Sequence, residues 1–154
     1  MNEPSRASAD ARYGTGLEAA RPYFEIIETA LDGLVDGETY FDFLADDFVF
    51  EFPFALPGWP ATIEGRAAVI AYFEGYGDRF QLDRADGLVT HLSRDPGVVI
   101  LEYQSHGHAV PTGGPYSNHY LSVIYIKDRR IVRWRDYWNP VEVLTALGGT
   151  ITLP

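Results

Sequence analysis

The chain has 154 residues, of which 46% are hydrophobic and 14% aromatic, so it is long enough to bury the core of one domain. Its 22 acidic and 12 basic residues give a net charge of -10, which would repel nucleic acid and anionic membrane surfaces. With no cysteine, the chain has no means of forming a disulfide, a thiolate nucleophile or a cysteine-ligated zinc site.

The first residues predict a polar, flexible arm. Residues 1–12 lack the apolar run of a secretory signal, and no stretch approaches the ~18 apolar residues of a membrane span. We therefore expect an arm over residues 1–12, one domain over residues 13–154, and a cytoplasmic protein.

Helical spacing dominates the next segment. Thr15 and Glu18 have the spacing of a capping box, whereas Pro22 predicts that the main helix begins near it. Apolar residues then recur at helical intervals up to an end at Gly37, namely at Tyr23, Ile27, Ala30, Leu31 and Leu34. A short helical segment should follow, with an exit turn at Asp46-Asp47 and with apolar residues at Tyr40, Phe41 and Leu44.

An aromatic stripe predicts a strand over residues 48–54. Alternate residues of this segment are phenylalanines, at Phe48, Phe50, Phe52 and Phe54. The sequence LPGWP then breaks the strand, and residues 61–64 predict a second short one. Gly65 should open a helix with one face formed by Val69, Phe73 and Tyr76.

The second half of the chain has the period of strands. Turn signals separate four expected strands, at residues 81–93, 98–110, 116–126 and 131–138. Helices first and a meander afterwards predict an α+β domain, in which helices cover one face of a curved antiparallel sheet.

The last strand carries the main candidate for acid/base chemistry. Alternation places Asp136 on one face with Trp134 and Trp138, and puts Arg133 and Arg135 on the other. Apolar neighbours penalise a carboxylate, so the pKa of Asp136 should rise toward the range useful for proton transfer. The alternative is a structural carboxylate paired with one of these arginines or with a strand tyrosine.

Two other strands offer polar side chains for a ligand. Tyr103 and Ser105 share one strand face, and Asn118 and Tyr120 share a face of the next strand. If both faces point inward, Tyr103, Asn118 and Tyr120 can donate hydrogen bonds to a carbonyl or enolate oxygen. The alternative is that the tyrosines fill the core.

The histidines fall out of phase with these residues. His106, His108 and His119 would lie on the outer sheet face, so we expect no metal site. With Val123 and Tyr125 they predict the interface of a homodimer.

Three segments stand out as motifs: FEFPFALPGWPATIEGRAAV at residues 50–69, GPYSNHY at residues 114–120 and RDYWNPVEVLTALG at residues 135–148. Together they resemble the phenazine-biosynthesis PhzA/PhzB group of SnoaL-like, nuclear transport factor 2-like proteins. The resemblance implies a cystatin-like cone, in which a curved mixed or antiparallel sheet wraps around the N-terminal helices and encloses a deep pocket. It also implies dimerisation through the open sheet face and an acid/base role for Asp136. The phenazine proteins use a histidine on the helix after the GR segment, where this chain has Tyr72 and Phe73.

The last strand, with the sequence IVRWRDYW, also resembles the final strand of the limonene epoxide hydrolase group. The chain thus resembles that group and ketosteroid isomerase more distantly than it resembles the PhzA/PhzB proteins. The hydrolase shares the aspartate at Asp136, but its Arg and second Asp correspond to Tyr103 and Ser105. Its water-holding Tyr and Asn correspond to Phe50 and Phe52. Four polar roles of that mechanism are thus missing from this chain.

The hypothesis is a small-molecule enzyme without a cofactor, in which Asp136 acts on a hydrophobic or cyclic carbonyl compound. Isomerisation, cyclisation, dehydration and condensation would each suit such a site. The predicted ligand-contacting residues are Phe50, Phe52, Trp59, Tyr72, Phe73, Tyr103, Ser105, Asn118, Tyr120, Trp134 and Trp138. The alternatives are a non-catalytic ligand-binding or dimeric scaffold protein and, less favoured, an epoxide hydrolase.

Overall fold

The computed structural model describes residues 12–14 and 16–154 of the chain. Thr15 and residues 1–11 of the predicted arm therefore lie outside the described residues, whereas Arg12 is described and forms an ion pair with Glu28 at 3.0 Å.

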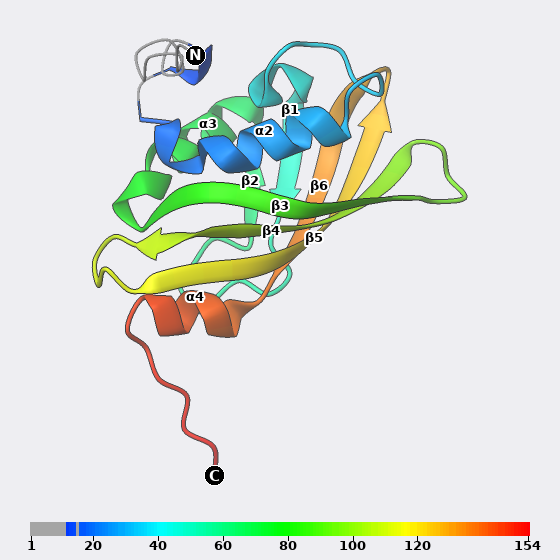
Figure 1. The fold of residues 1–154 in the computed structure, drawn as a ribbon. Helices are drawn as coiled ribbons and strands as arrows, with labels where there is room; N and C mark the ends of the chain where they lie inside the picture. The colour runs from blue at the N-terminus through cyan, green and yellow to red at the C-terminus, as the bar shows by residue number, and fades with distance from the viewer. Residues whose placement is uncertain (1–11, 15) are drawn as a thin grey trace.

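Six strands form one curved sheet (Figure 1). They are β1 (Leu44–Glu51), β2 (Thr62–Glu64), β3 (Phe80–Leu92), β4 (Val98–Ala109), β5 (Pro115–Lys127) and β6 (Arg130–Trp138). Their order in the sheet is β2-β1-β6-β5-β4-β3, with β1 parallel to β6 and the other neighbours antiparallel. The sheet is therefore mixed.

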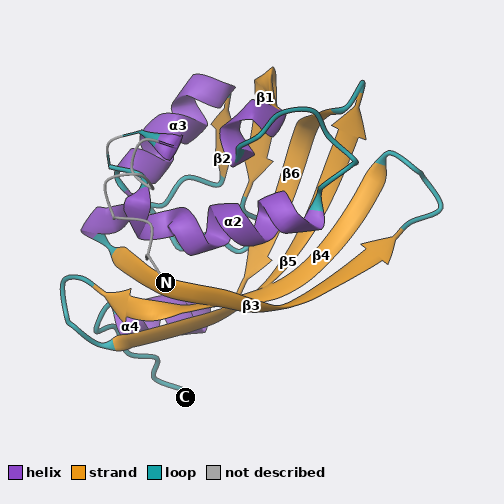
Figure 2. Cartoon of the chain, turned by 45° about the horizontal axis from the view of Figure 1, so that its top comes forward, coloured by secondary structure: helices purple, strands orange, loops and turns teal. Residues whose placement is uncertain are grey.

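The helices lie mainly on the concave side of this sheet. Besides the short 3-10 turns η1 (Glu18–Ala20), η2 (Tyr40–Phe43) and η3 (Tyr76–Asp78), they are α2 (Arg21–Ala30), α3 (Arg66–Glu74) and α4 (Pro140–Ala146). Figure 2 shows α2 lying across the sheet with α3 beside it, while α4 closes the end near the C-terminus. α2 packs on β3, α3 on β1 and α4 on β5. The predicted α+β class with N-terminal helices in a curved sheet is confirmed.

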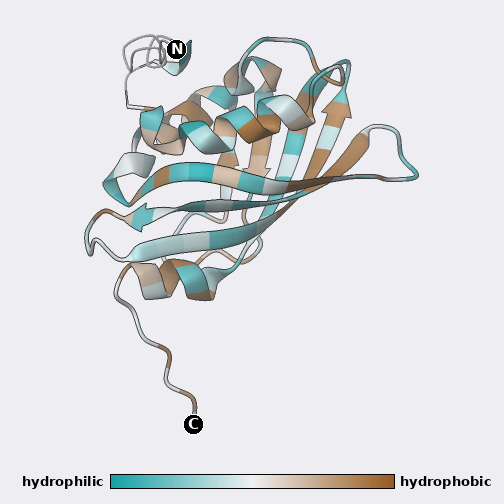
Figure 3. Ribbon diagram, in the orientation of Figure 1, coloured by the Kyte–Doolittle hydropathy of each residue, from teal (hydrophilic) through white to brown (hydrophobic). Residues whose placement is uncertain are grey.

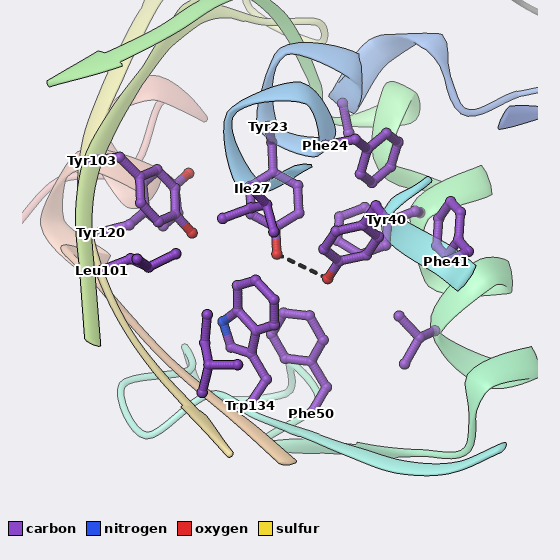
Figure 4. Packing of buried hydrophobic residues seen from close by; sticks show 14 of the residues in the cluster. Tyr23, Phe24, Ile27, Tyr40, Phe41, Phe50, Leu101, Tyr103, Tyr120 and Trp134 are labelled. Atoms are coloured by element: carbon purple, nitrogen blue, oxygen red, sulfur yellow. Dashed lines mark hydrogen bonds between the residues drawn. The ribbon is translucent and has the colours of Figure 1, made fainter. Parts of the chain in front are cut away.

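Alternating polarity explains this packing. Hydrophobic and hydrophilic bands alternate along α2 (Figure 3), and its buried residues include Phe24 and Ile27. Along β5, every second side chain from Tyr116 to Ile124 is buried and faces the helices. Aromatic rings fill much of the resulting core, among them Phe24, Tyr40 and Trp134 (Figure 4).

The main helix is shorter than predicted. It ends at Ala30 instead of continuing to Gly37, and Leu34 is 39% exposed. Gly33 has φ +80, a left-handed conformation that glycine adopts at little cost and that ends helices.

The phenylalanine strand is also displaced from its prediction. β1 begins at Leu44, so Asp46 and Asp47 lie within it and form no exit turn. The register against β6 shifts between Leu44 and Val49, which accommodates the two exposed aspartates in an irregular stretch. β1 ends at Glu51, and Phe54 lies outside the strand, 56% exposed.

The C-terminal helix α4 was not anticipated from hydrophobic periodicity. Its start is nevertheless encoded locally, because the Asn139 side chain accepts a hydrogen bond from the Val141 N–H at 3.0 Å. Pro140 occupies the first helical position, where its missing N–H costs nothing. The turn from β6 into α4 helps to close the pocket described below.

Candidate functional site

A pocket lies between the concave sheet face and the helices. Its enclosed volume is about 50 Å³. Apolar and tyrosine side chains dominate the wall, and Asp136 is the only charged residue among the described lining residues. The wall consists of Ala20, Tyr23, Phe50, Phe52, Trp59, Tyr72, Phe73, Tyr76, Phe80, Leu82, Ser105, Tyr116, Tyr120, Asp136, Trp138 and Val143.

Asp136 is held on β6 by two hydrogen-bond donors. It is 5% exposed, and its strand partner across the sheet is Ser122 on β5. The Ser122 hydroxyl donates to Oδ1 at 2.7 Å, and the Trp134 indole N–H points to the same oxygen at 3.4 Å. Within residues 12–14 and 16–154, no group donates a hydrogen bond to Oδ2. That oxygen is therefore left for a ligand.

Burial makes Asp136 a weak acid. Removal from water raises its pKa to about 7 because the charged form loses hydration. The hydrogen bonds from Ser122 and Trp134, together with the nearby Tyr103 hydroxyl, favour the carboxylate and offset only part of that rise in pKa. At neutral pH both protonation states are therefore populated.

The arginines of β6 do not neutralise this carboxyl. Arg133 and Arg135 form ion pairs with Glu51 on the opposite sheet face, at 3.0 and 3.8 Å. In the described part of the chain, no basic side chain lies within ion-pair distance of Asp136. The arginine pairing that would make Asp136 a structural residue is thus not formed.

Two separate pairs of hydroxyl groups lie near the carboxyl. The Tyr103 hydroxyl lies 3.0 Å from Ser122 Oγ. Since Ser122 gives its proton to Asp136, Tyr103 is the donor to Ser122. The Tyr23 and Tyr40 hydroxyls are paired at 2.9 Å (Figure 4). Asp136 is thus linked through Ser122 to the core.

A second polar group lies farther along β5. The Tyr116 and Tyr120 hydroxyls are 2.8 Å apart, and Asn118 Nδ2 donates to the Tyr116 hydroxyl at 3.1 Å. Asn118 also holds the turn into α4, because its Oδ1 accepts from the Asn139 N–H at 2.9 Å. Asn118 therefore connects the pocket residue Tyr116 to the turn that leads into α4.

Ser105 is the least satisfied polar residue of the wall. It is fully buried, and its Oγ has no hydrogen-bond partner among the described residues. A buried hydroxyl without a partner costs about 1–3 kcal/mol, which a ligand oxygen in the pocket would recover.

The structure brings most of the predicted ligand-contacting residues together. Eight of them line the pocket with Asp136, namely Phe50, Phe52, Trp59, Tyr72, Phe73, Ser105, Tyr120 and Trp138. Tyr103, Asn118 and Trp134 do not line it and instead hydrogen-bond to Ser122, Tyr116 and Asp136 respectively.

The sequence patterns considered above did not predict several residues of the site. Ser122 and Tyr116 lie in phase with Asn118 and Tyr120 on β5, so strand alternation alone would have identified them. Tyr23 and Tyr76 enter from α2 and η3, and their approach depends on how these helices cross the sheet.

The histidines lie away from this pocket. His106 hydrogen-bonds to Asp86 and to Ser117, each at 2.9 Å, and His91 contacts Glu102 at 2.7 Å. Among the described residues, no group of three His, Cys, Asp or Glu side chains is arranged to hold a metal ion. The helices of the described ranges are too short or too polar to cross a bilayer.

Comparisons with known proteins agree with this architecture. YesE of Bacillus subtilis, a protein of uncharacterised function, is 42% identical over 115 residues, which are 75% of this chain and 78% of YesE. The uncharacterised PhzA/B-like protein PA3332 of Pseudomonas aeruginosa is 33% identical over 127 residues, or 81% of this chain and 89% of PA3332. The crystal structure of an isomerase candidate from Bacillus subtilis matches with a TM-score of 0.70 and 33% identity, covering 99% of this chain and 100% of that one.

The family profile gives the same result. The nuclear transport factor 2-like fold and the resemblance to PhzA/PhzB proteins are confirmed. The profile of the SnoaL-like domain matches residues 15–134, which include most of the sheet and the helices α2 and α3. The chain therefore belongs to the SnoaL-like domain family.

Proposed function

We propose that this protein is a small-molecule enzyme of the isomerase or cyclase kind, in which Asp136 transfers a proton on a hydrophobic or cyclic carbonyl compound. Membership of the SnoaL-like family and the 33% identity to an isomerase candidate support this kind of activity. The family match ends at residue 134, so the role of Asp136 depends on the pocket itself.

The observation that carries the proposal is the state of Asp136. Its carboxyl is buried in an apolar pocket, has a pKa of about 7 and forms no ion pair within the described residues. A group with a pKa near the working pH accepts and returns protons with comparable ease. A purely structural carboxyl would gain stability from a cation, and the two nearby arginines of β6 pair with Glu51 instead.

The proposed step uses groups that the pocket already holds. Ionised Asp136 takes a proton from the carbon beside a ligand carbonyl, and the electron pair of that C–H bond forms an enolate. Ser105 and the Tyr116–Tyr120 pair can donate hydrogen bonds to the enolate oxygen. In a ligand with a C=C bond next to that carbon, the enolate is a conjugated dienolate, and protonated Asp136 returns the proton to its far carbon, which shifts the C=C bond and isomerises the ligand. When the enolate instead attacks a second carbonyl, the proton goes to the resulting alkoxide, which cyclises the ligand.

Deuterium exchange tests this step without knowledge of the natural substrate. The protein is incubated in D2O with 2-tetralone or cyclohexanone, and loss of the protons beside the carbonyl is followed by NMR. Wild type should accelerate exchange, and Asp136→Asn should reduce that acceleration by about 10²-fold or more. Asp83→Asn is the matched control, because Asp83 is an exposed aspartate on β3. Equal exchange by wild type and Asp136→Asn would refute the role of Asp136.

A non-catalytic binding protein is the second candidate. The Ser105 hydroxyl, which lacks a partner among the described residues, favours it, because this buried group would recover a hydrogen bond from any bound polar ligand, whether or not a proton is then transferred. Saturable binding of both ketones, without any exchange above the buffer rate, would support this second candidate.

A further inference from the structure

A second cavity adjoins the pocket at Asp136. This outer chamber has a volume of about 430 Å³ and shares Trp59, Tyr72, Tyr76 and Phe80 with the inner pocket. The inner pocket measures only about 50 Å³, so a ligand containing a ring needs more room than this pocket alone offers, and the adjoining outer chamber is the nearest space on its shared wall. The chemistry of the outer chamber therefore bears on which ligands the site accepts.

Arg79 lines the outer chamber just before β3. Its guanidinium lies over the Trp59 ring, 4.4 Å from the ring centre. A guanidinium stacked on an indole keeps its N–H groups in the plane of the fork, where they can bind a carboxylate with two hydrogen bonds. The stacking thus orients Arg79 without using its hydrogen-bond donors.

Arg79 also differs from most other arginines of the described chain. Its guanidinium has no carboxylate within ion-pair distance in residues 12–14 and 16–154, and Asp78 beside it makes no ion pair. Ion pairs with carboxylates are formed instead by Arg12, Arg21, Arg66, Arg84, Arg129, Arg133 and Arg135. Among the described residues, Arg79 is therefore a cation without a carboxylate partner, in the wall of the cavity that adjoins the apolar pocket.

The charge of Arg79 acts on Tyr72, which lines both the inner pocket and the outer chamber. Burial and the Asp136 carboxylate raise the pKa of the Tyr72 phenol, and Arg79 opposes that rise. Among the described lining residues of the two chambers, the charged groups are Asp136 inside and Asp78 and Arg79 outside. The chain as a whole has a net charge of -10 and repels anions, whereas Arg79 gives the outer chamber a cationic group that can attract one.

We infer that the ligand of this pocket carries a carboxylate, which Arg79 binds in the outer chamber while the ligand's apolar ring contacts Trp59 and the inner wall. This inference rests on the proposed function only in placing the ligand in this pocket. It names the substrate class as planar or cyclic carbonyl compounds that bear a carboxylate at the end remote from Asp136.

Two probes of equal shape test the inference. The affinities of 2-naphthoate and 2-naphthamide are measured by quenching of tryptophan fluorescence. Wild type should bind the naphthoate about 10-fold more tightly, since a charge-assisted pair replaces a neutral contact. Arg79→Met should bring the two affinities within about 2-fold, because methionine keeps packing against Trp59 but has no charge. Arg79→Lys should retain part of the preference.

Matched variants distinguish the charge of Arg79 from its packing and from the net charge of the chain. Arg94→Met removes the same charge from the β3–β4 turn and should leave the preference unchanged. Asp136→Asn should also keep it, so loss of exchange activity and loss of carboxylate preference are separate outcomes. The inference is overturned if wild type binds neither probe or both equally, or if Arg79→Met keeps the preference. Equal weakening of both probes in Arg79→Met would also overturn it, because Arg79 would then only position Trp59.

Discussion

The two faces of β6 place carboxylates in opposite surroundings. On the outer face, Glu51 of the neighbouring strand is 25% exposed and contacts Arg133 and Arg135. On the inner face, Asp136 is 5% exposed and contacts a hydroxyl and an indole N–H, with no cation within the described residues. Because alternate residues of a strand point to opposite faces, a step of one residue separates these environments.

The difference shows which carboxylate is suited to chemistry. A partly exposed ion pair such as Glu51 with its arginines typically contributes about 0–1 kcal/mol to stability. Burying a carboxyl without a cation costs stability but brings its pKa into the range in which protons are exchanged. Within the described residues, the fold therefore pairs the Glu51 carboxylate with two arginines but leaves the Asp136 carboxyl without a cation.

Matched amide substitutions on the two faces should give the largest contrast. In the ketone exchange experiment, Asp136→Asn should lower activity by about 10²-fold or more, whereas Glu51→Gln should stay within about 2-fold of wild type. Glu51→Gln leaves two arginines without a partner, but both are partly exposed to water. A comparable loss in both variants would mean that the two faces do not differ in function.

Loss of the hydrogen bond from Ser122 to Asp136 should reduce activity less than loss of the Asp136 carboxyl itself. Removing it with Ser122→Ala takes away the main donor to the Asp136 carboxylate, so the pKa of Asp136 should rise further above its value of about 7. The midpoint of the pH–activity profile should move up by about one unit, and the rate at pH 7 should fall about 5-fold, because the ionised fraction of Asp136 falls from about one half to about one tenth. Ser117→Ala, on the outer face of β5, removes a hydrogen bond to His106 and should not move that midpoint.

Stability should depend on pH in a way that Asp136→Asn removes. The folded protein holds the Asp136 proton more tightly than the unfolded chain, because burial raises the pKa from 3.8 to about 7. Its contribution to stability is therefore fully present below the unfolded pKa and is lost as pH rises through about 7. Urea unfolding should show Asp136→Asn gaining stability over wild type between about pH 4 and pH 7, with no further gain above. A difference that is constant over this range would indicate an ordinary pKa.

Substitutions on the outer face of the sheet should have the smallest effect on activity. We propose that it forms a homodimer interface, since Val123 and Tyr125 lie beside the exposed His119 on β5. Light scattering at micromolar concentration should give twice the mass of one chain for wild type. Val123→Lys, which adds a charge beside Arg135, should shift the protein toward monomer with the exchange activity unchanged. A monomeric wild type would refute this interface.

Much of the sheet and part of the site were predictable from the sequence. Strand alternation placed Asp136 with Trp134 and Trp138, and Ser105 in the pocket wall, because side-chain direction in a strand depends only on position. The turn signals near residues 95–97 and 111–115 similarly defined where β4 begins and ends.

Features that depend on tertiary contacts were not predictable in this way. β1 extends to Leu44 because it pairs with β6, a strand far away in the sequence. Tyr23 reaches the pocket only because of the angle at which α2 crosses the sheet, which periodicity does not specify. The stacking of Arg79 on Trp59 likewise depends on the conformation of the loop between β1 and β2.

The pKa of Asp136 tests the central claim most directly. Carbon NMR of selectively labelled aspartate can follow the side-chain carboxyl through a pH titration, with its resonance identified by its absence in Asp136→Asn. A midpoint near pH 7 would agree with a buried carboxyl that lacks a counter-ion. A midpoint at or below the ordinary value of 3.8 would show that the carboxylate is stabilised in the fold, and would contradict its assignment as the proton-transfer group.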